Sequence, residues 1–285
     1  MTAVGLALVS AFLFGAMSVG LKMGLARHAD VGLATVATVV GALAVTAVIA
    51  AVEVPARGVH AGAAWPFLLA GLLQPGIGQI FVTYAIRDAG AARASVVLGS
   101  APLVSVTIAL LLLGEPVRAA LIGGAVLIVA GGVELARERG RPEHVLTIGL
   151  VFAFAGTICF STRDNVLRWL AGDTSVPPGV AAVAALLGGA LLIVAVFAPR
   201  VRFSLRPALP FLGVGVVFGL SYVSLFEAYY RGRVTVVSPL IATESLWGVL
   251  LALLLIRRTE LVGRHVVAGA LLVVAGAVLI GVNAH

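Results

Sequence analysis

Charged residues are scarce in this sequence. Only 11% of its 285 residues are charged while 61% are hydrophobic, and the mean hydropathy is +1.15. A water-soluble fold of this length would have too little polar surface to cover itself. The scarcity of charge therefore excludes a soluble protein and predicts an integral membrane protein.

Cysteine and metal-binding patterns are equally sparse. The single cysteine, Cys159, lies in an apolar run, so a disulfide framework and a cysteine-based metal site are both excluded. The five histidines are scattered, and none forms an HExxH or other metal spacing. There is also no Gly-x-Ser-x-Gly elbow and no Walker lysine. We therefore expect no metal, no cofactor, no catalytic residue and no ATP-driven chemistry within this chain.

The net charge of +7 could suggest a nucleic-acid partner. The nineteen Lys and Arg residues, however, are spread through short loops between apolar runs instead of forming one cluster. Basic loops of this kind face lipid headgroups and set membrane topology. We expect membrane lipids and a small-molecule substrate as partners, no nucleic acid, and a monomer or a homodimer.

The apolar runs predict about ten membrane-spanning helices, because one crossing of the hydrocarbon takes ~20 apolar residues. The connectors between them are too short to fold by themselves, which leaves no extramembrane domain for a soluble active site. The predicted spans are 2–24, 31–52, 65–87, 92–113, 118–136, 146–169, 179–198, 208–230, 233–256 and 263–282.

The two halves of the chain resemble each other. The segment GAVLIVAGGV at 124–133 recurs as GALLVVAGAV at 269–278, identical at seven of ten positions. Upstream, Arg93-Ala-Ser-Val-Val has a counterpart in Arg233-Val-Thr-Val-Val. An odd number of spans in each half makes the second copy enter from the opposite side, as in the inverted repeats of secondary transporters. We therefore predict an all-α integral membrane fold of ten helices in two inverted five-helix repeats, 1–140 and 141–285.

Longer stretches carry a family resemblance. TYAIRDAGAARASVVLGSAPLVSVTIALLLLGEP in the first half, and SYVSLFEAYYRGRVTVVSPLIATESLWGVLLALLLIRR with GALLVVAGAVLIG in the second, resemble the EamA-type drug/metabolite transporters. The resemblance covers essentially the whole chain. It implies ten helices, a central cavity between two inverted repeats, and membrane transport of small metabolites, often outward.

Two features depart from that family pattern. Phe14 stands where a tryptophan is common, and the second-half counterpart of the Gly114-Glu115-Pro116 turn reads Arg257-Arg258-Thr259-Glu260. We interpret the first turn as structural, because Pro116 suits the start of a helix and Glu115 its positive end. The second turn is hard to align with it.

Glu244 is the main candidate site residue. It lies about eleven residues into the ninth span, and the midplane is expected roughly ten residues into each span, since a helix rises 1.5 Å per residue. No other acidic residue is as deep. A carboxylate there predicts a site for a proton or a cationic substrate. The alternative is a hydrogen bond that joins neighbouring helices.

Other polar and aromatic residues could line the same cavity. Gln74 and Gln79 flank Pro75 near the middle of the third span, and hydrogen bonding to substrate or between helices explains them equally well. Trp247 shares a helix face with Glu244. Tyr222 is a candidate for stacking on the substrate. Tyr84 is a candidate for the rim or gate of the cavity, although its position is more typical of an interface anchor.

The stretch CFSTRDNVLRW at 159–169 brings charge into an apolar span. Asp164, Asn165 and Arg168 share one helix face, so we expect Asp164 to pair with Arg168 while Arg163 points elsewhere. Asp164 lies about eighteen residues into its span, near the far interface, where snorkelling lowers the cost of charge. The group is predicted to form the rim or gate of the cavity, or else an interfacial ion pair.

Two arguments on membrane orientation disagree. The loops after the odd-numbered spans carry thirteen of the nineteen Lys and Arg residues, which predicts that these loops are cytoplasmic and both termini outside. The family resemblance implies the reverse. In either orientation a multi-pass protein of a bacterial-type plasma membrane is expected.

The sequence thus favours a secondary transporter. The resemblance implies an exporter, and the deep carboxylate of Glu244 suits proton coupling. The alternative is a membrane-embedded enzyme that acts on a lipid-linked substrate. Such an enzyme needs several polar residues at one bilayer face, and only Arg163, Asp164 and Arg168 approach that pattern. Substrate, direction and coupling do not follow from the sequence.

Overall fold

A computed structural model describes most of the chain, and the described part is helical. It covers residues 2–57, 61–104, 107, 119–136, 146–172, 174–201, 204–232, 234–256 and 262–282, and this part holds no strand. Six of its helical segments are long and apolar enough to cross a membrane, and three shorter apolar helices accompany them. The chain is a multi-pass membrane protein.

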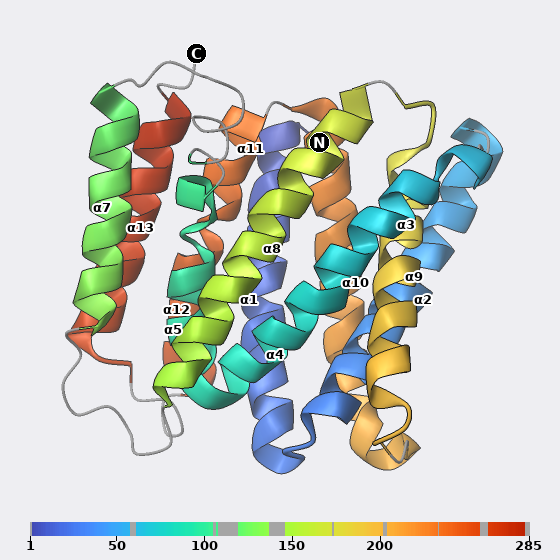
Figure 1. The fold of residues 1–285 in the computed structure, drawn as a ribbon, viewed down its shortest axis with the longest axis horizontal. Helices are drawn as coiled ribbons and strands as arrows, with labels where there is room; N and C mark the ends of the chain where they lie inside the picture. Colours follow the sequence, from blue (N-terminus) through green and yellow to red (C-terminus); the bar gives the residue numbers. More distant parts are fainter. Residues whose placement is uncertain are drawn as a thin grey trace.

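Figure 1 shows the described helices in chain order. Where both ends of a predicted span are described, most helix ends agree with it to within a few residues, because the apolar runs end at charged, proline or glycine residues. The helices are α1 (Ala3–Arg27), α2 (Val31–Arg57), η1 (Ala61–Ala63), α3 (Trp65–Gly71), η2 (Leu72–Ile77), α4 (Gly78–Ala89), α5 (Ala91–Leu98), α7 (Ala119–Ala136), α8 (Thr147–Gly172), α9 (Pro178–Phe197), α10 (Leu205–Arg231), α11 (Val234–Ile241), α12 (Glu244–Leu255) and α13 (Arg264–Val282).

Helix α1 occupies the centre of the bundle. It packs against α10, α12 and α11, while α2 packs between α9 and α10, and α4 lies along α8. Helices α7 and α13 form a tight pair at one side of the molecule (Figure 1). Elements of the first half therefore pack mainly on elements of the second half, so the two halves share one core.

Three helices are interrupted near their middle. The third span breaks at η2, where Gln74 has a non-helical backbone (φ −146°, ψ 116°) beside Pro75. Helix α5 ends at Leu98 and the chain is helical again from residue 101, while α11 ends at Ile241 and α12 begins at Glu244.

The two interrupted segments α5 and α12 cross where glycines permit close approach. A side chain on Gly99 would meet the Ser245 Cβ at 2.8 Å, and one on Gly248 would overlap the Ser95 hydroxyl. A side chain on Gly15 of α1 would lie 2.8 Å from the Gly248 backbone nitrogen. Helix pairs in membranes use small residues in this way to bring their backbones together. The crossing thus depends on the absence of side chains.

Gly15→Ala should destabilise the folded protein by about 1–3 kcal/mol, because the new methyl group meets backbone atoms that cannot move aside. Gly213→Ala is the matched control, since nothing lies within 4 Å of a side chain there. The control should be neutral or slightly stabilising, since Ala favours helix over Gly. Unfolding in mixed detergent micelles measures both, and equal stabilities of the two variants would contradict this packing.

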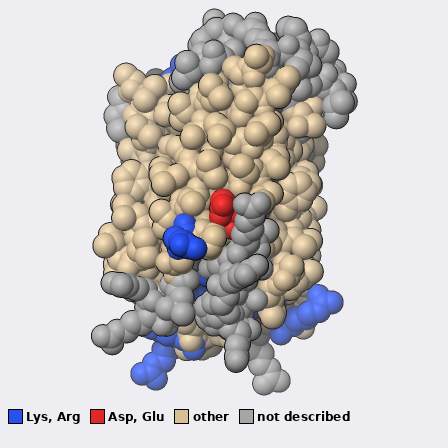
Figure 2. All heavy atoms as spheres, turned by 90° about the vertical axis from the view of Figure 1, so that its left-hand side faces the viewer, with Lys and Arg blue, Asp and Glu red and all other residues tan. Residues whose placement is uncertain are grey.

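The outer surface suits lipid. Large apolar side chains on several helices are exposed, among them Val126 and Leu254. Figure 2 shows one such face almost free of charge, with most of its Lys and Arg in the lower part. Lys22 and Arg27 belong to the last turns of α1, whose end lies at the lower edge of Figure 1.

Candidate functional site

A small cavity lies among α1, α5, α8, α10, α11 and α12. Its empty space is about 370 Å³, its mouth included. Three of its residues are ionisable, and most of the others are apolar or aromatic. The cavity is lined by Phe14, Leu98, Ala101, Phe160, Arg163, Asp164, Leu225, Ser238, Ile241, Ala242 and Glu244.

The lining residues lie in the middle and one half of the bundle. Phe14 is near the midpoint of α1, Glu244 is at the break between α11 and α12, and Asp164 and Leu225 lie beyond the midpoints of α8 and α10. These positions are at mid-height or toward the upper end in Figure 1, where α1 begins and α13 ends. One turn from the lining residues Leu98 and Glu244, α5 and α12 approach closely at Ser95 and Gly248.

Arg163 and Asp164 form an ion pair in the cavity wall. The Arg163 Nε lies 2.8 Å from the Asp164 Oδ1, and the Tyr229 hydroxyl donates a hydrogen bond to Oδ2 at 3.0 Å. The prediction that Asp164 pairs with Arg168 was wrong, because the Arg168 guanidinium donates to the backbone carbonyl of Tyr229 at 3.1 Å. Arg163, which was expected to point elsewhere, supplies the partner.

Neighbouring helices cover this pair, and its place at the rim or gate of the cavity stays a prediction. Arg163 is only 1% exposed and Asp164 5%, so neither reaches the surface. The sequence indicated only the distance of Asp164 from the start of its span. It could not show that other helices cover this face of α8. Burial of both charges means that each one depends on the other.

Aromatic rings hold the guanidinium of Arg163 on both sides. Its central carbon lies 5.5 Å from the Phe160 ring centroid and 5.1 Å from that of Tyr222. Both distances suit cation–π attraction, which gains strength when water is excluded. The rings therefore fix the guanidinium beside the cavity, and Tyr222, a predicted site residue, acts on the cavity through Arg163.

Glu244 lies at the break between α11 and α12 and is 8% exposed. It is the first residue of α12, at the positive end of that half-helix. Within the described part of the chain, no hydrogen-bond donor or ion-pair partner contacts its carboxylate. The structure therefore brings the deepest predicted carboxylate into the same cavity as Arg163 and Asp164, with its oxygens open to a ligand.

Gln74 and Gln79 are fully buried and do not line this cavity. The backbone carbonyl of Gln74 accepts a 2.8 Å hydrogen bond from the Tyr222 hydroxyl, and Gln79 Nε2 contacts the Met17 sulfur at 3.9 Å. The side-chain amide atoms of Gln74, and Gln79 Oε1, have no hydrogen-bond partner among the described residues. The two glutamines thus form a second polar group, separated from Glu244 by Tyr222 and Arg163.

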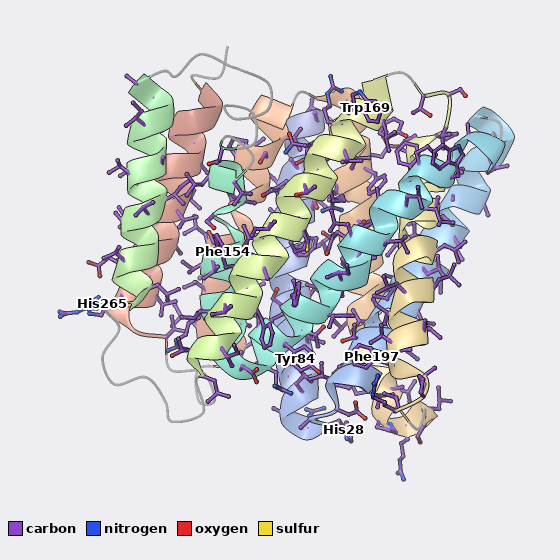
Figure 3. All side chains as sticks on the ribbon, viewed as in Figure 1. His28, Tyr84, Phe154, Trp169, Phe197 and His265 are labelled. Atoms are coloured by element: carbon purple, nitrogen blue, oxygen red, sulfur yellow. The ribbon has the colours of Figure 1, made fainter. Side chains whose placement is uncertain are left out.

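The remaining predicted residues lie outside the cavity lining. Trp247 packs edge-to-face on Phe12, with ring centroids 5.3 Å apart. Tyr84 contacts Phe152 and the Arg87 guanidinium near the lower ends of the helices (Figure 3). Asn165 donates to the Ser161 backbone carbonyl at 2.8 Å, which is a bond within its own helix.

Sequence reasoning missed several lining residues. Phe160, Ser238 and Leu225 carried no signal, and Tyr229 is separated from Asp164 by 65 residues. No local pattern connects residues so far apart. The 114–116 turn and its second-half counterpart 257–260 fall outside the described residues. Within the described residues there is no group of three or more His, Cys, Asp or Glu side chains that could hold a metal.

Comparison with known proteins identifies a family and a similar solved structure. A model described as the EamA-like transporter family matches residues 1–134 and again residues 147–282. A solved chain titled only "Crystal structure of protein" is 25% identical, with a TM-score of 0.66 over 96% of each chain. No curated protein matches.

Proposed function

The chain belongs to the EamA-like transporter family, and on that premise we propose that it is a secondary transporter that exports a small metabolite through the cavity of Glu244, Arg163 and Asp164. The observation that carries the proposal is the carboxylate of Glu244 in mid-bundle, open to the cavity and without a hydrogen-bond partner in the described part of the chain. Ionisable groups at this depth in a membrane protein are costly unless they serve a ligand or an ion.

We also propose ten membrane-spanning helices in two inverted repeats, 1–140 and 141–285. The two family matches, one in each half, support this duplication. So do the breaks after Leu98 and Ile241, which interrupt the fourth and ninth predicted spans at corresponding points. In transporters with inverted repeats, interrupted helices of this kind surround the substrate near the midplane.

The transport cycle that we propose is alternating access coupled to protons at Glu244. One helical turn from the lining residues Leu98 and Glu244, the close approach of α5 and α12 at Ser95 and Gly248 would block one side of the cavity. Exposure of Glu244 to the other side would therefore require α12 to separate from Gly15 and Ser95. If Glu244 binds a proton and the substrate alternately, the movement of protons in one direction is coupled to the movement of substrate in the other.

We expect the end of the bundle that carries Lys22 and Arg27 to face the cytoplasm of a bacterial-type plasma membrane, with both termini outside. Lys and Arg in short loops are retained on the cytoplasmic side, and Lys22, Arg27 and Arg264 support that assignment. A single-cysteine series on a Cys159→Ser background tests it. Cysteines near residue 28 should resist a membrane-impermeant maleimide in whole cells, and one near residue 2 should react. The reverse pattern would contradict this orientation.

The alternative of a membrane-embedded enzyme gains no support from the cavity. That function requires polar residues at one bilayer face, where a lipid-linked substrate could reach them. Arg163 and Asp164 are instead buried and paired, and Arg168 is bonded to a backbone carbonyl. Their arrangement suits the wall of an enclosed site better than a catalytic surface.

An untargeted metabolite comparison tests the proposed function. Cells that produce the protein are compared with matched cells that produce the Glu244→Gln variant, in both cytosol and medium. We expect at least one small metabolite to fall in the cytosol and rise in the medium only with the unaltered protein. If no metabolite differs between the two strains, the export proposal is overturned.

A further inference from the structure

The cavity contains more negative than positive groups. Its ionisable residues are one arginine and two carboxylic acids, Asp164 and Glu244. Arg163 and Asp164 form an ion pair, and the Tyr229 hydroxyl donates a hydrogen bond to Asp164. The Glu244 carboxylate remains without a neutralising partner at bonding distance among the described residues. An enclosed carboxylate of this kind needs either a proton or an opposite charge from a ligand.

The interruption between α11 and α12 gives a further reason to expect a positively charged ligand. In transporters with discontinuous helices, the N-terminal end of a half-helix points at an anionic group of the substrate. In this chain that position on α12 is occupied by the protein's own anionic residue, Glu244. The ligand therefore has no need to provide the negative group, and the charge missing from the site is positive.

The rest of the lining is apolar and narrow. Phe14 and Phe160 meet edge-to-face with ring centroids 5.3 Å apart, and Leu98, Leu225 and Ile241 form other parts of the wall. Such walls stabilise a compact hydrocarbon or aromatic body through apolar burial.

We propose that the ligand of this cavity is a small organic monocation, a primary amine on a compact apolar or aromatic body, with its ammonium group at Glu244. This inference rests on the proposed function and names the class of its substrate. The ammonium would donate to the Glu244 carboxylate, and the Ser238 hydroxyl lines the same space. The body would lie against Phe14 and Phe160.

A charge series on one hydrocarbon skeleton tests the proposal. The full-length protein in lipid nanodiscs is titrated calorimetrically at pH 8 with 2-phenylethylamine, 2-phenylethanol, 3-phenylpropanoate and phenylalanine. We expect the amine to bind at least about tenfold more tightly than the alcohol, since a charge-assisted hydrogen bond contributes more than the corresponding neutral one. The acid should bind most weakly, because it would face Glu244.

Three variants determine whether Glu244 causes the preference. Glu244→Gln should remove the difference between amine and alcohol. Glu244→Asp should keep the preference, because it retains the charge, and it also serves if the Gln variant fails to fold. Glu134→Gln is the matched control: the same change in an α7 residue that pairs with His265 outside the cavity should leave the series unchanged.

Several results would overturn the inference. These are equal binding of alcohol and amine, tighter binding of the acid or of phenylalanine, no binding of the amine at millimolar concentration, or an amine preference that survives Glu244→Gln. Tighter binding of phenylalanine would mean that Arg163, whose Nη1 has no hydrogen-bond partner among the described residues, receives a substrate carboxylate. In each case, metabolite export by the unaltered protein would still stand, so the two proposals can fail separately.

Discussion

Glu244→Gln should lower the export rate roughly 10- to 100-fold while the protein remains inserted and folded. The amide has nearly the same shape as the carboxylate but carries no charge and cannot exchange a proton. Loss of a hydrogen bond to a charged group costs about 1.5–3 kcal/mol, and each 1.36 kcal/mol corresponds to tenfold in rate. The measurement is initial efflux, from proteoliposomes, of the metabolite that the cell comparison identifies.

The controls separate a transport defect from a folding defect. Size-exclusion profile and unfolding midpoint in detergent should match those of the unaltered protein, because no hydrogen bond to the Glu244 side chain is lost from the described structure. Glu134→Gln should transport normally, since its carboxylate contacts His265 at 2.7 Å away from the cavity. Normal flux through Glu244→Gln would disprove the central role of this carboxylate.

Asp164→Ala should destabilise the protein by about 3–5 kcal/mol, the typical effect of removing one partner from a buried ion pair. The substitution leaves the Arg163 guanidinium buried between two rings with no counter-charge, and it also removes the acceptor of the Tyr229 hydroxyl. Reversible unfolding in mixed detergent micelles gives the free energy of unfolding.

A second variant makes this prediction specific. The double change Arg163→Met with Asp164→Leu removes both charges and should recover much of the lost stability, because apolar residues often replace a buried ion pair at little cost. Glu134→Gln, from a pair whose side chains are each 28% exposed, should change stability by no more than about 1 kcal/mol. An effect of Asp164→Ala that is no larger than this control would contradict the buried pairing.

The helices of this protein could be predicted closely. Their ends depend on where apolar runs meet basic, proline and glycine residues, and that information is local in the chain. Helix α8, for example, was expected over 146–169 and spans Thr147–Gly172. The depth of Glu244 was also a local quantity, and it led to a residue that lines the cavity.

The partners of each polar side chain were less predictable. Asp164 could pair with Arg168 along one helix face, and the spacing of the two residues favoured that pair. In the structure, the Tyr229 hydroxyl of α10 donates a hydrogen bond to the Asp164 carboxylate. The Arg168 guanidinium donates instead to the backbone carbonyl of Tyr229. Gln74 and Gln79, which were predicted as candidates for the same cavity, do not line it.

The sequence by itself determined that this protein lies in a membrane, where its helices run and how far Glu244 lies into its span. Hydropathy and the rise per residue can both be followed along the chain without knowledge of the packing. Only the tertiary structure decided which side chains meet. The direction in which a residue faces depends on how helices tilt, break and pack against elements 60 or more residues away. For that reason the pair of Arg163 and Asp164, predicted at the rim, lies with Glu244 in the wall of the cavity.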